Sequence, residues 1–225
     1  MPTDHTIRAF DEDINHLDIL IAQMGGQAEN MVRDAVDALL RGDHDLARAV
    51  IVRDKLLDTL EAEIERLAIQ LIALRSPVAG DLRQVVAAFK ISGMLERVGD
   101  HAKNMARSTL KIVDFRFDAL ALVPGIAKIA ESMIHSALDA YAALDPQLAE
   151  AVVARDDEVD ALYHDLIRHL ISHLADQSPN VITATELLLV ARNIERIGDN
   201  ATNIAEAVFY AATGHIMPDR HKTTQ

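Results

Sequence analysis

The sequence contains no cysteine and no tryptophan, and aromatic residues make up only 4% of its 225 residues. The absence of cysteine excludes disulfides, thiolate metal sites and cysteine nucleophiles, so any metal must be held by oxygen or imidazole ligands. Because aromatic rings are scarce, the core has to be built from Leu, Ile, Val, Ala and Met. Hydrophobic residues make up 50% of the chain, and this aliphatic mixture favours helices.

Positive charge is also scarce, since 22 Lys and Arg residues oppose 35 Asp and Glu residues for a formal net charge of -13. This charge repels phosphate backbones and anionic lipids, so we expect no nucleic-acid partner. No apolar run approaches the roughly 20 residues of a membrane-spanning helix. The amino-terminal residues lack the basic patch and apolar run of a secretory signal. We therefore expect a cytoplasmic protein that does not insert into a membrane.

Hydrophobic residues recur with a helical period along nearly the whole chain. In the first half the pattern predicts helices over about 7–41, 43–75 and 77–113. Gly42 is expected to end the first helix and Asp43 to cap the second, because glycine readily adopts the left-handed conformation and an aspartate accepts from free N–H groups. Ser76 and Pro77 predict the N-cap and the first residue of the third helix.

The second half repeats this order of signals. Its helices are predicted to open at Pro124, at Asp145–Pro146 and at Ser178–Pro179, and the last one ends near Gly214. Long helices with short connections favour antiparallel neighbours. The sequence therefore predicts an all-α fold of two tandem, pseudo-symmetric three-helix bundles with six long helices. The expected divisions are a first bundle over 1–114, a second bundle over 115–216 and a disordered tail over 217–225.

One segment of the chain is repeated in the second half. ERVGDHAKNMA at 96–106 and ERIGDNATNIA at 195–205 share seven of eleven residues. On a helix that turns by about 100° per residue, Glu96, Asp100 and Asn104 fall on one face, roughly opposite an apolar stripe. The second copy forms the same face with the equivalent residues Glu195, Asp199 and Asn203.

The helix before each repeated segment carries acidic residues that are expected to lie level, along the helix axis, with the acids of that segment. Counted outward from the turn, an antiparallel hairpin sets Asp58 level with Glu96 and Asp54 level with Asp100. The same count in the second half pairs Asp160 with Glu195 and Asp156 with Asp199. The relative rotation of the helices does not follow from this count, so the acids meet only if the two faces turn toward each other.

Four carboxylates that do meet repel one another unless they are protonated or bridged by a cation. Oxygen-only ligands suit magnesium, manganese or iron, so a metal site in each half is one interpretation. An ordinary solvated acidic face is the other. Lys103 and Arg107 can neutralise part of the first face, whereas Thr202 and Glu206 take their places in the second and leave Arg192 as the compensating cation. The second face is therefore harder to balance without a metal.

A glycine lies inside each repeated helix, at Gly99 and Gly198. Glycine in a helix costs about 1 kcal/mol relative to alanine, so its presence needs a reason. We expect close approach of another helix, and space for an ion beside the aspartate is the alternative.

The doubled ERxGDxAxNxA segment, the acid pairs of RDKLLD at 53–58 and RDDEVD at 155–160, and the SPVAGDLRQV turn at 76–85 resemble the PhoU family of phosphate-uptake regulators. The resemblance extends from about Phe10 to Gly214. It implies an all-α homodimer of two similar three-helix bundles that negatively regulates the phosphate-starvation response. Its partners would be the ATP-binding subunit of the phosphate ABC transporter and a phosphate-sensing histidine kinase.

The resemblance also implies metal ions bound by the acidic motifs, with iron, manganese, magnesium or zinc as the candidates. The ligands implied by position are Asp54, Asp58, Glu96, Asp100, Asp156, Asp160, Glu195 and Asp199, with Asn104 and Asn203 as extra oxygen ligands. The halves differ at the second turn, where Asn180-Val181-Ile182 replaces Asp81-Leu82-Arg83.

Two other functional classes compete with this interpretation. His44-Asp45 resembles the dyad of metal-dependent phosphohydrolases, although its place at a helix start favours a capping segment, and we expect no catalytic residues. His169 and His173 have the spacing of a zinc pair, although alignment with Leu67 and Leu71 favours helix packing or a dimer contact on the apolar side of the helix. A metal-storing helical protein would share every feature of the regulator except its partners.

Overall fold

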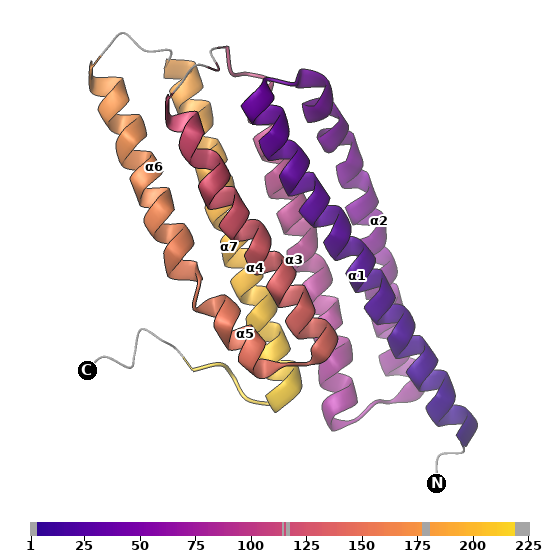
Figure 1. Ribbon diagram of the computed structural model, residues 1–225. Coiled ribbons are helices and arrows are strands. Elements are labelled where there is room, and N and C mark those ends of the chain that lie inside the picture. Colours follow the sequence, from indigo (N-terminus) through magenta and orange to yellow (C-terminus); the bar gives the residue numbers. More distant parts are fainter. Residues whose placement is uncertain (1–3, 114, 116–117, 177–180, 219–225) are drawn as a thin grey trace.

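The computed structural model describes residues 4–113, 115, 118–176 and 181–218, and in these residues it is all-α, with no β-strand. The elements are α1 (Asp4–Arg41), α2 (His44–Arg75), α3 (Ala79–Thr109), the 3-10 helix η1 (Asp118–Leu122), α4 (Val123–Ala143), α5 (Pro146–Val153), α6 (Asp156–Asp176) and α7 (Val181–Thr213) (Figure 1). The predicted fold class is confirmed.

Several of the predicted helix boundaries form as the sequence indicates. Gly42 has a φ of 62°, in the left-handed region, and lies between α1 and α2. Asp43 then caps α2, because its Oδ1 accepts from the N–H groups of Asp45 at 3.0 Å and Leu46 at 2.9 Å. The Asp145 side chain caps α5 in the same way. Pro124 lies in the first turn of α4, one residue after the helix begins.

The turn between α2 and α3 differs from the prediction. Ser76 does not cap α3; it ends α2 with a φ of 49°, and its N–H donates to Ile72 O at 3.2 Å. Val78 is extended, and α3 begins at Ala79 without a side-chain cap. The prediction was wrong because Ser76 closes the preceding helix before Pro77 can open the next one. The corresponding Ser178–Pro179 turn lies outside the described residues.

The predicted fifth helix is divided in two. The backbone turns at Ala154 and Arg155 between α5 and α6, where the Arg155 N–H donates to Val152 O at 3.0 Å. The Arg155 guanidinium reaches α4 and donates to Ser132 Oγ at 2.9 Å. The described α-helices therefore number seven where six long helices were predicted, and α2 has no such break.

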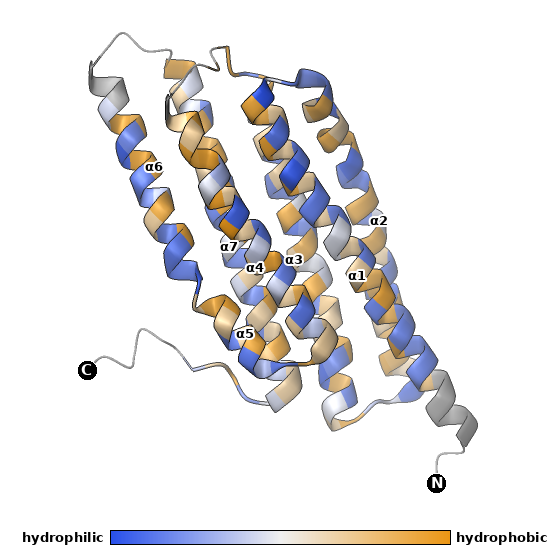
Figure 2. Ribbon diagram, in the orientation of Figure 1, coloured by the Kyte–Doolittle hydropathy of each residue, from blue (hydrophilic) through white to orange (hydrophobic). Residues whose placement is uncertain are grey.

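The helices form two bundles that lie side by side, α1–α3 and α4–α7. The outer helices in Figure 1 are α2 and α6, and α3 packs against α7 between them. Figure 2 shows apolar residues recurring along every helix, and the buried ones of both halves belong to one hydrophobic cluster. The predicted division at 114 and 115 stays a prediction, and residues 219–225 of the predicted tail lie outside the described part.

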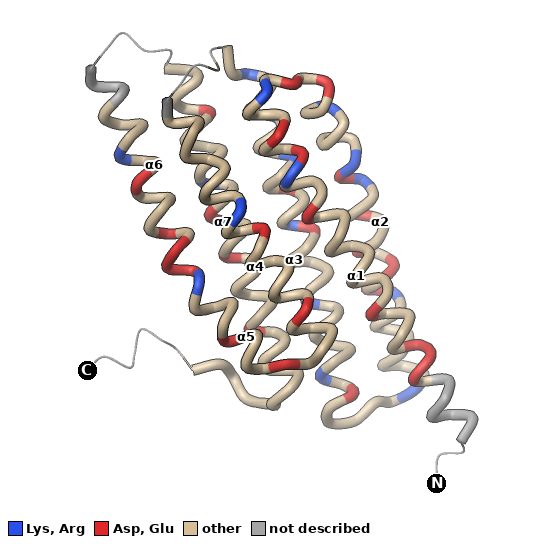
Figure 3. The backbone as a smooth tube through the Cα atoms, viewed as in Figure 1, with Lys and Arg blue, Asp and Glu red and all other residues tan. Residues whose placement is uncertain are grey.

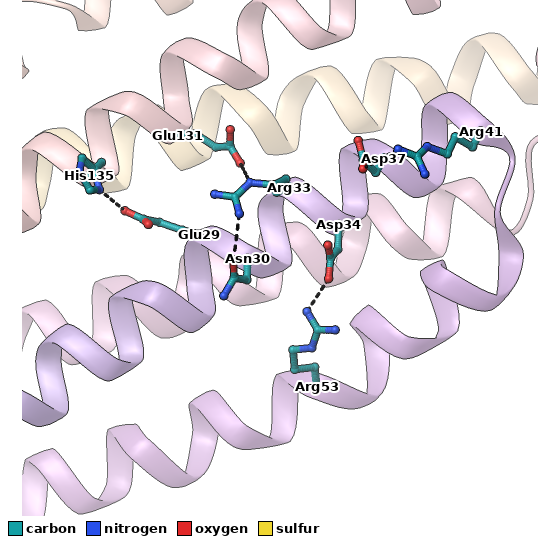
Figure 4. Close-up of polar contacts among 9 residues, drawn as sticks. All are labelled: Glu29, Asn30, Arg33, Asp34, Asp37, Arg41, Arg53, Glu131 and His135. Carbon is teal, nitrogen blue, oxygen red and sulfur yellow. Dashed lines mark hydrogen bonds and ion pairs between the residues drawn. The ribbon is translucent and has the colours of Figure 1, made fainter.

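Polar contacts between α1 and α4 add to the junction of the bundles (Figure 4). His135 Nδ1 lies 3.1 Å from Glu29 Oε1, and Arg33 Nε lies 3.6 Å from Glu131 Oε1. Among the described helices, none combines the length and the apolar composition that a membrane crossing requires.

Two candidate metal centres

The first acidic cluster lies between α2 and α3. Asp54 of α2 is buried, with 6% of its surface exposed, and its Oδ2 accepts from Lys103 Nζ of α3 at 2.6 Å. Lys103 also forms an ion pair with Asp100 one turn earlier on α3. One ammonium therefore joins the two carboxylates that the sequence placed at equal height, so the two acidic faces do turn toward each other.

Glu96 lies beside the same pair. Burial and, after it, the charges of neighbouring carboxylates together raise the pKa of the Glu96 carboxyl to about 7. These neighbours are, in order of influence, Asp100, Glu61, Asp58 and Asp54. The four acids predicted for the first half thus lie within electrostatic reach of one another.

Glu61 is a member of this cluster that the predicted ligand set omits. Burial raises its pKa, and the charges of Glu65 and Asp58 add to the effect. Its Oε1 lies 3.4 Å from the position of a Cβ added at Gly93, so the carboxylate points at α3. The signal in the sequence is the regular spacing of acids along α2, which continues past Asp58 by one turn.

The second acidic cluster lies between the start of α6 and the middle of α7. Burial raises the pKa of Asp156, and the charges of Asp199 and Asp160 raise it further. Burial likewise raises the pKa of Asp199, with Asp160 as the next cause. For Glu195 the causes are burial and then Asp199. All four acids predicted for the second half are therefore neighbours.

The second cluster is neutralised differently from the first. Thr202 stands at the position equivalent to Lys103, and its uncharged hydroxyl oxygen is buried with no hydrogen-bond partner among the described residues. Arg192 donates to Glu195 Oε1 at 2.6 Å, from the same face of α7. The other carboxylate oxygen, Glu195 Oε2, is buried and has no hydrogen-bond partner among the described residues.

The two helical glycines explain how the paired helices come so close. A Cβ added at Gly99 would collide with the Leu57 side chain of α2. A Cβ added at Gly198 would lie 3.3 Å from Val159 Cγ1 of α6. The structural interpretation is confirmed, because each glycine lets the neighbouring acid-bearing helix approach.

The two predicted amide ligands lie apart from the carboxylate contacts just described. Asn104 Oδ1 accepts from Arg107 Nη1 at 3.2 Å. Asn203 lines a cavity of about 460 Å³ between α3 and α7, together with Lys90 and Glu206. Whether either amide binds a metal stays a prediction.

The donor set suits hard or borderline cations, because it consists of carboxylate oxygens. Within the described ranges, however, no three or more Asp, Glu or His side chains are placed to hold one ion. In the first cluster the Lys103 ammonium joins two of the expected ligands, so a metal does not fit there without displacing it. In the second cluster, among the described residues, Glu195 Oε2 has no hydrogen-bond partner and no lysine joins the acids, so an ion there would have no ammonium to displace. The ligand sets of both halves stay predictions.

The histidine candidates from the sequence occupy ordinary structural positions. His44 begins α2 and its ring lies 6.2 Å from that of Phe115, while Asp45 pairs with Arg48 at 2.7 Å in the first turn. The dyad thus belongs to the capped start of α2. His169 is exposed, which corrects its expected place on the apolar side, and its Nδ1 lies 3.0 Å from Asp165 O. The side chain of His173 lies outside the described residues.

The observations define a class of protein, a duplicated helical chain whose halves each pair acidic motifs on antiparallel helices. The PhoU domain model matches residues 21–109 and 123–208, one segment in each half. The chain belongs to the PhoU domain family.

Similar proteins cover nearly the whole chain. Phosphate-specific transport system accessory protein PhoU homologs from Zymomonas mobilis and Caulobacter vibrioides are each 44% identical, over 96% and 94% of this chain and 92% and 93% of their own lengths. The crystal structure of PhoU from Pseudomonas aeruginosa has a TM-score of 0.87 at 32% identity, covering 92% of this chain and all of that one. PhoU from Streptococcus pneumoniae, a phosphate transport system regulatory protein, also has a TM-score of 0.87, at 25% identity over 93% of this chain and 100% of its own.

Proposed function

We propose that the chain is a negative regulator of phosphate uptake and of the phosphate-starvation response, with no enzymatic activity of its own. The observation that carries this proposal is the 44% identity, over 96% of the chain, to a protein named a phosphate-specific transport system accessory protein. The acidic motifs of both halves lie inside the segments that the family model matches. The proposed function therefore involves both halves of the chain.

The proposed partners are the ATP-binding subunit of a phosphate ABC transporter and a phosphate-sensing histidine kinase. The net charge of -13 supports docking on basic surfaces, and Figure 3 shows acidic residues along both outer helices. Complementary charge mainly speeds association and makes it salt-sensitive. We propose that the chain acts in the cytoplasm, because the proposed partners present their nucleotide-binding parts on the cytoplasmic side of the membrane. We also propose that it acts as a homodimer, as the family resemblance implies.

We further propose that iron, manganese, magnesium or zinc ions bind the acidic clusters. Asp156, Asp160, Glu195 and Asp199 would be ligands in the second half. Asp54, Asp58, Glu96 and Asp100 would be ligands in the first half, where an ion has to displace the Lys103 ammonium. A bound ion would neutralise the mutual repulsion that raises the pKa values of these carboxyls. Occupancy would therefore tighten the contact between the two helices of each cluster.

The decisive test is the phosphatase activity secreted by phosphate-replete cells with and without the gene. Deletion should raise this activity, because the starvation response would no longer be repressed. Restoring the natural gene should bring it back to the basal level, and a variant with Asp156→Asn and Asp199→Asn would show whether repression needs the second cluster. Unchanged activity on deletion would contradict the regulator and favour a metal-handling helical protein.

A further inference from the structure

Lys103 occupies the position of a bridging cation in the first acidic cluster. Its Nζ lies 2.6 Å from Asp54 Oδ2 on α2 and forms an ion pair with Asp100 on its own helix. The Lys103 side chain is only 16% exposed and that of Asp54 only 9%. A partly buried ammonium between two carboxylates interacts with both in a medium that screens poorly.

The second half has no equivalent ammonium. The position of Lys103 is taken by Thr202, whose side chain carries no charge. Among the described residues, no lysine or arginine forms an ion pair with Asp156, Asp160 or Asp199, and Arg192 pairs with Glu195 from the exposed side. The buried Glu195 Oε2 has no hydrogen-bond partner there. The first cluster therefore has an ammonium that joins two carboxylates, whereas in the second Arg192 and Arg196 lower the pKa values of Glu195 and Asp199 but join no two carboxylates among the described ion pairs.

We propose that Lys103 is a built-in counter-ion that makes the first cluster independent of metal, so that metal binding belongs to the second cluster. This inference rests on the proposed metal binding and divides it unequally between the halves. A cation entering the first cluster would have to displace an ammonium that is covalently tethered between Asp54 and Asp100. A cation entering the second cluster would meet carboxylates that have no such competitor.

The internal repeat offers a reciprocal exchange as the test. Lys103→Thr gives the first cluster the uncharged residue of the second, and Thr202→Lys gives the second cluster the ammonium of the first. Lys90→Thr is the matched control, because it removes an exposed lysine from the same helix α3. The full-length chain would be stripped with chelator and equilibrated with Mn²⁺, and the bound metal would be counted after gel filtration.

The expected results separate the two clusters. Lys103→Thr should raise bound Mn²⁺ per chain about twofold, because two clusters of similar oxygen donors are then open to the ion. Thr202→Lys should abolish most of the binding, and Lys90→Thr should leave it unchanged. In the natural chain, Asp156→Asn with Asp199→Asn should remove binding, whereas Asp54→Asn with Asp100→Asn should not.

Several results would overturn the proposal. These are loss of Mn²⁺ through the first-cluster pair of substitutions, an unchanged stoichiometry in Lys103→Thr, or no binding by any variant. Circular dichroism would confirm folding, and Lys103→Met, which keeps the length of the side chain, would replace Lys103→Thr if that variant failed to fold. Failure here is distinguishable from failure of the regulator, because the phosphatase assay on the gene deletion does not involve Lys103.

Discussion

Glu96→Gln is expected to stabilise the metal-free chain at alkaline pH and to leave its stability nearly unchanged in acid. The pKa of Glu96 is raised from 4.5 to about 7 by burial and then by neighbouring carboxylates. The folded chain therefore holds this proton through a pH range in which the unfolded chain has lost it. Since the folded state binds more protons, the free energy of unfolding falls as the pH rises from about 4.5 to about 7.

The size of the effect follows from the same interval. Without solvent screening, the rise of the Glu96 pKa from 4.5 to about 7 corresponds to about 3.4 kcal/mol in the free energy of unfolding. Glu96 is partly exposed, so solvent screening lowers the expected gain to about 1 to 2 kcal/mol. Glutamine keeps the shape of the side chain and cannot ionise, so the variant should show this gain above neutral pH. The midpoint of thermal unfolding should rise there by about 2 to 8 °C for a chain of this size.

The assay is urea unfolding at about pH 4 and about pH 8 with chelator present, comparing the natural chain with Glu96→Gln. Glu206→Gln is the control, because it makes the same chemical change at an exposed position of α7. A gain of equal size at both pH values, or a loss of stability at the higher one, would refute the reasoning. Either result would mean that burial and the neighbouring carboxylates do not raise the pKa of Glu96 in the folded chain.

Four further substitutions test the packing, one buried hydrogen bond and one helix cap. Gly26→Ala should raise the free energy of unfolding by about 1 kcal/mol, since alanine favours a helix and its Cβ would meet no described atom within 4 Å. Gly99→Ala should lower it by about 1 kcal/mol or more in thermal melts, because the added Cβ collides with the fully buried Leu57 side chain of α2. Tyr141→Phe should cost about 1 to 2 kcal/mol in urea unfolding, because the carboxylate of Asp18 loses the hydroxyl that donates to it at 2.6 Å. Asp43→Ala should cost about 1 kcal/mol, read by circular dichroism, because α2 loses its N-cap.

The fold could be predicted well from the sequence wherever one residue type decides the local backbone. Gly42 and Asp43 form the expected end and cap because the left-handed conformation and the side-chain acceptor are local properties. Ser76 was assigned to the wrong helix, because both serving as an N-cap and closing the preceding helix are local options and the packing of α2 against α3 decides between them. The break at Ala154 was not predicted, since neither glycine nor proline marks it.

The levels of the acidic residues along the paired helices were predicted correctly, whereas the residues that make up the first cluster were predicted only in part. Counting along antiparallel helices placed Asp54 level with Asp100, and the Lys103 ammonium that joins them confirms the count. The central position of Lys103 depends on the rotation of α3 about its axis, which residue spacing does not determine. Glu61 was left out of the predicted ligand set for the same reason. Residue spacing does not determine that its carboxylate points at Gly93 of α3.

The interruption between α5 and α6 gives the two halves different mechanical properties. In the first half α2 is one rod, so Asp54 and Asp58 can leave α3 only if a long helix detaches. In the second half Asp156 and Asp160 lie in the first two turns of a separate helix that begins just after the break. Detaching α6 therefore opens the second cluster while α4, α5 and α7 stay packed. In native-state hydrogen exchange, the amides of α6 should open as an independent unit and at lower free energy than those of α2.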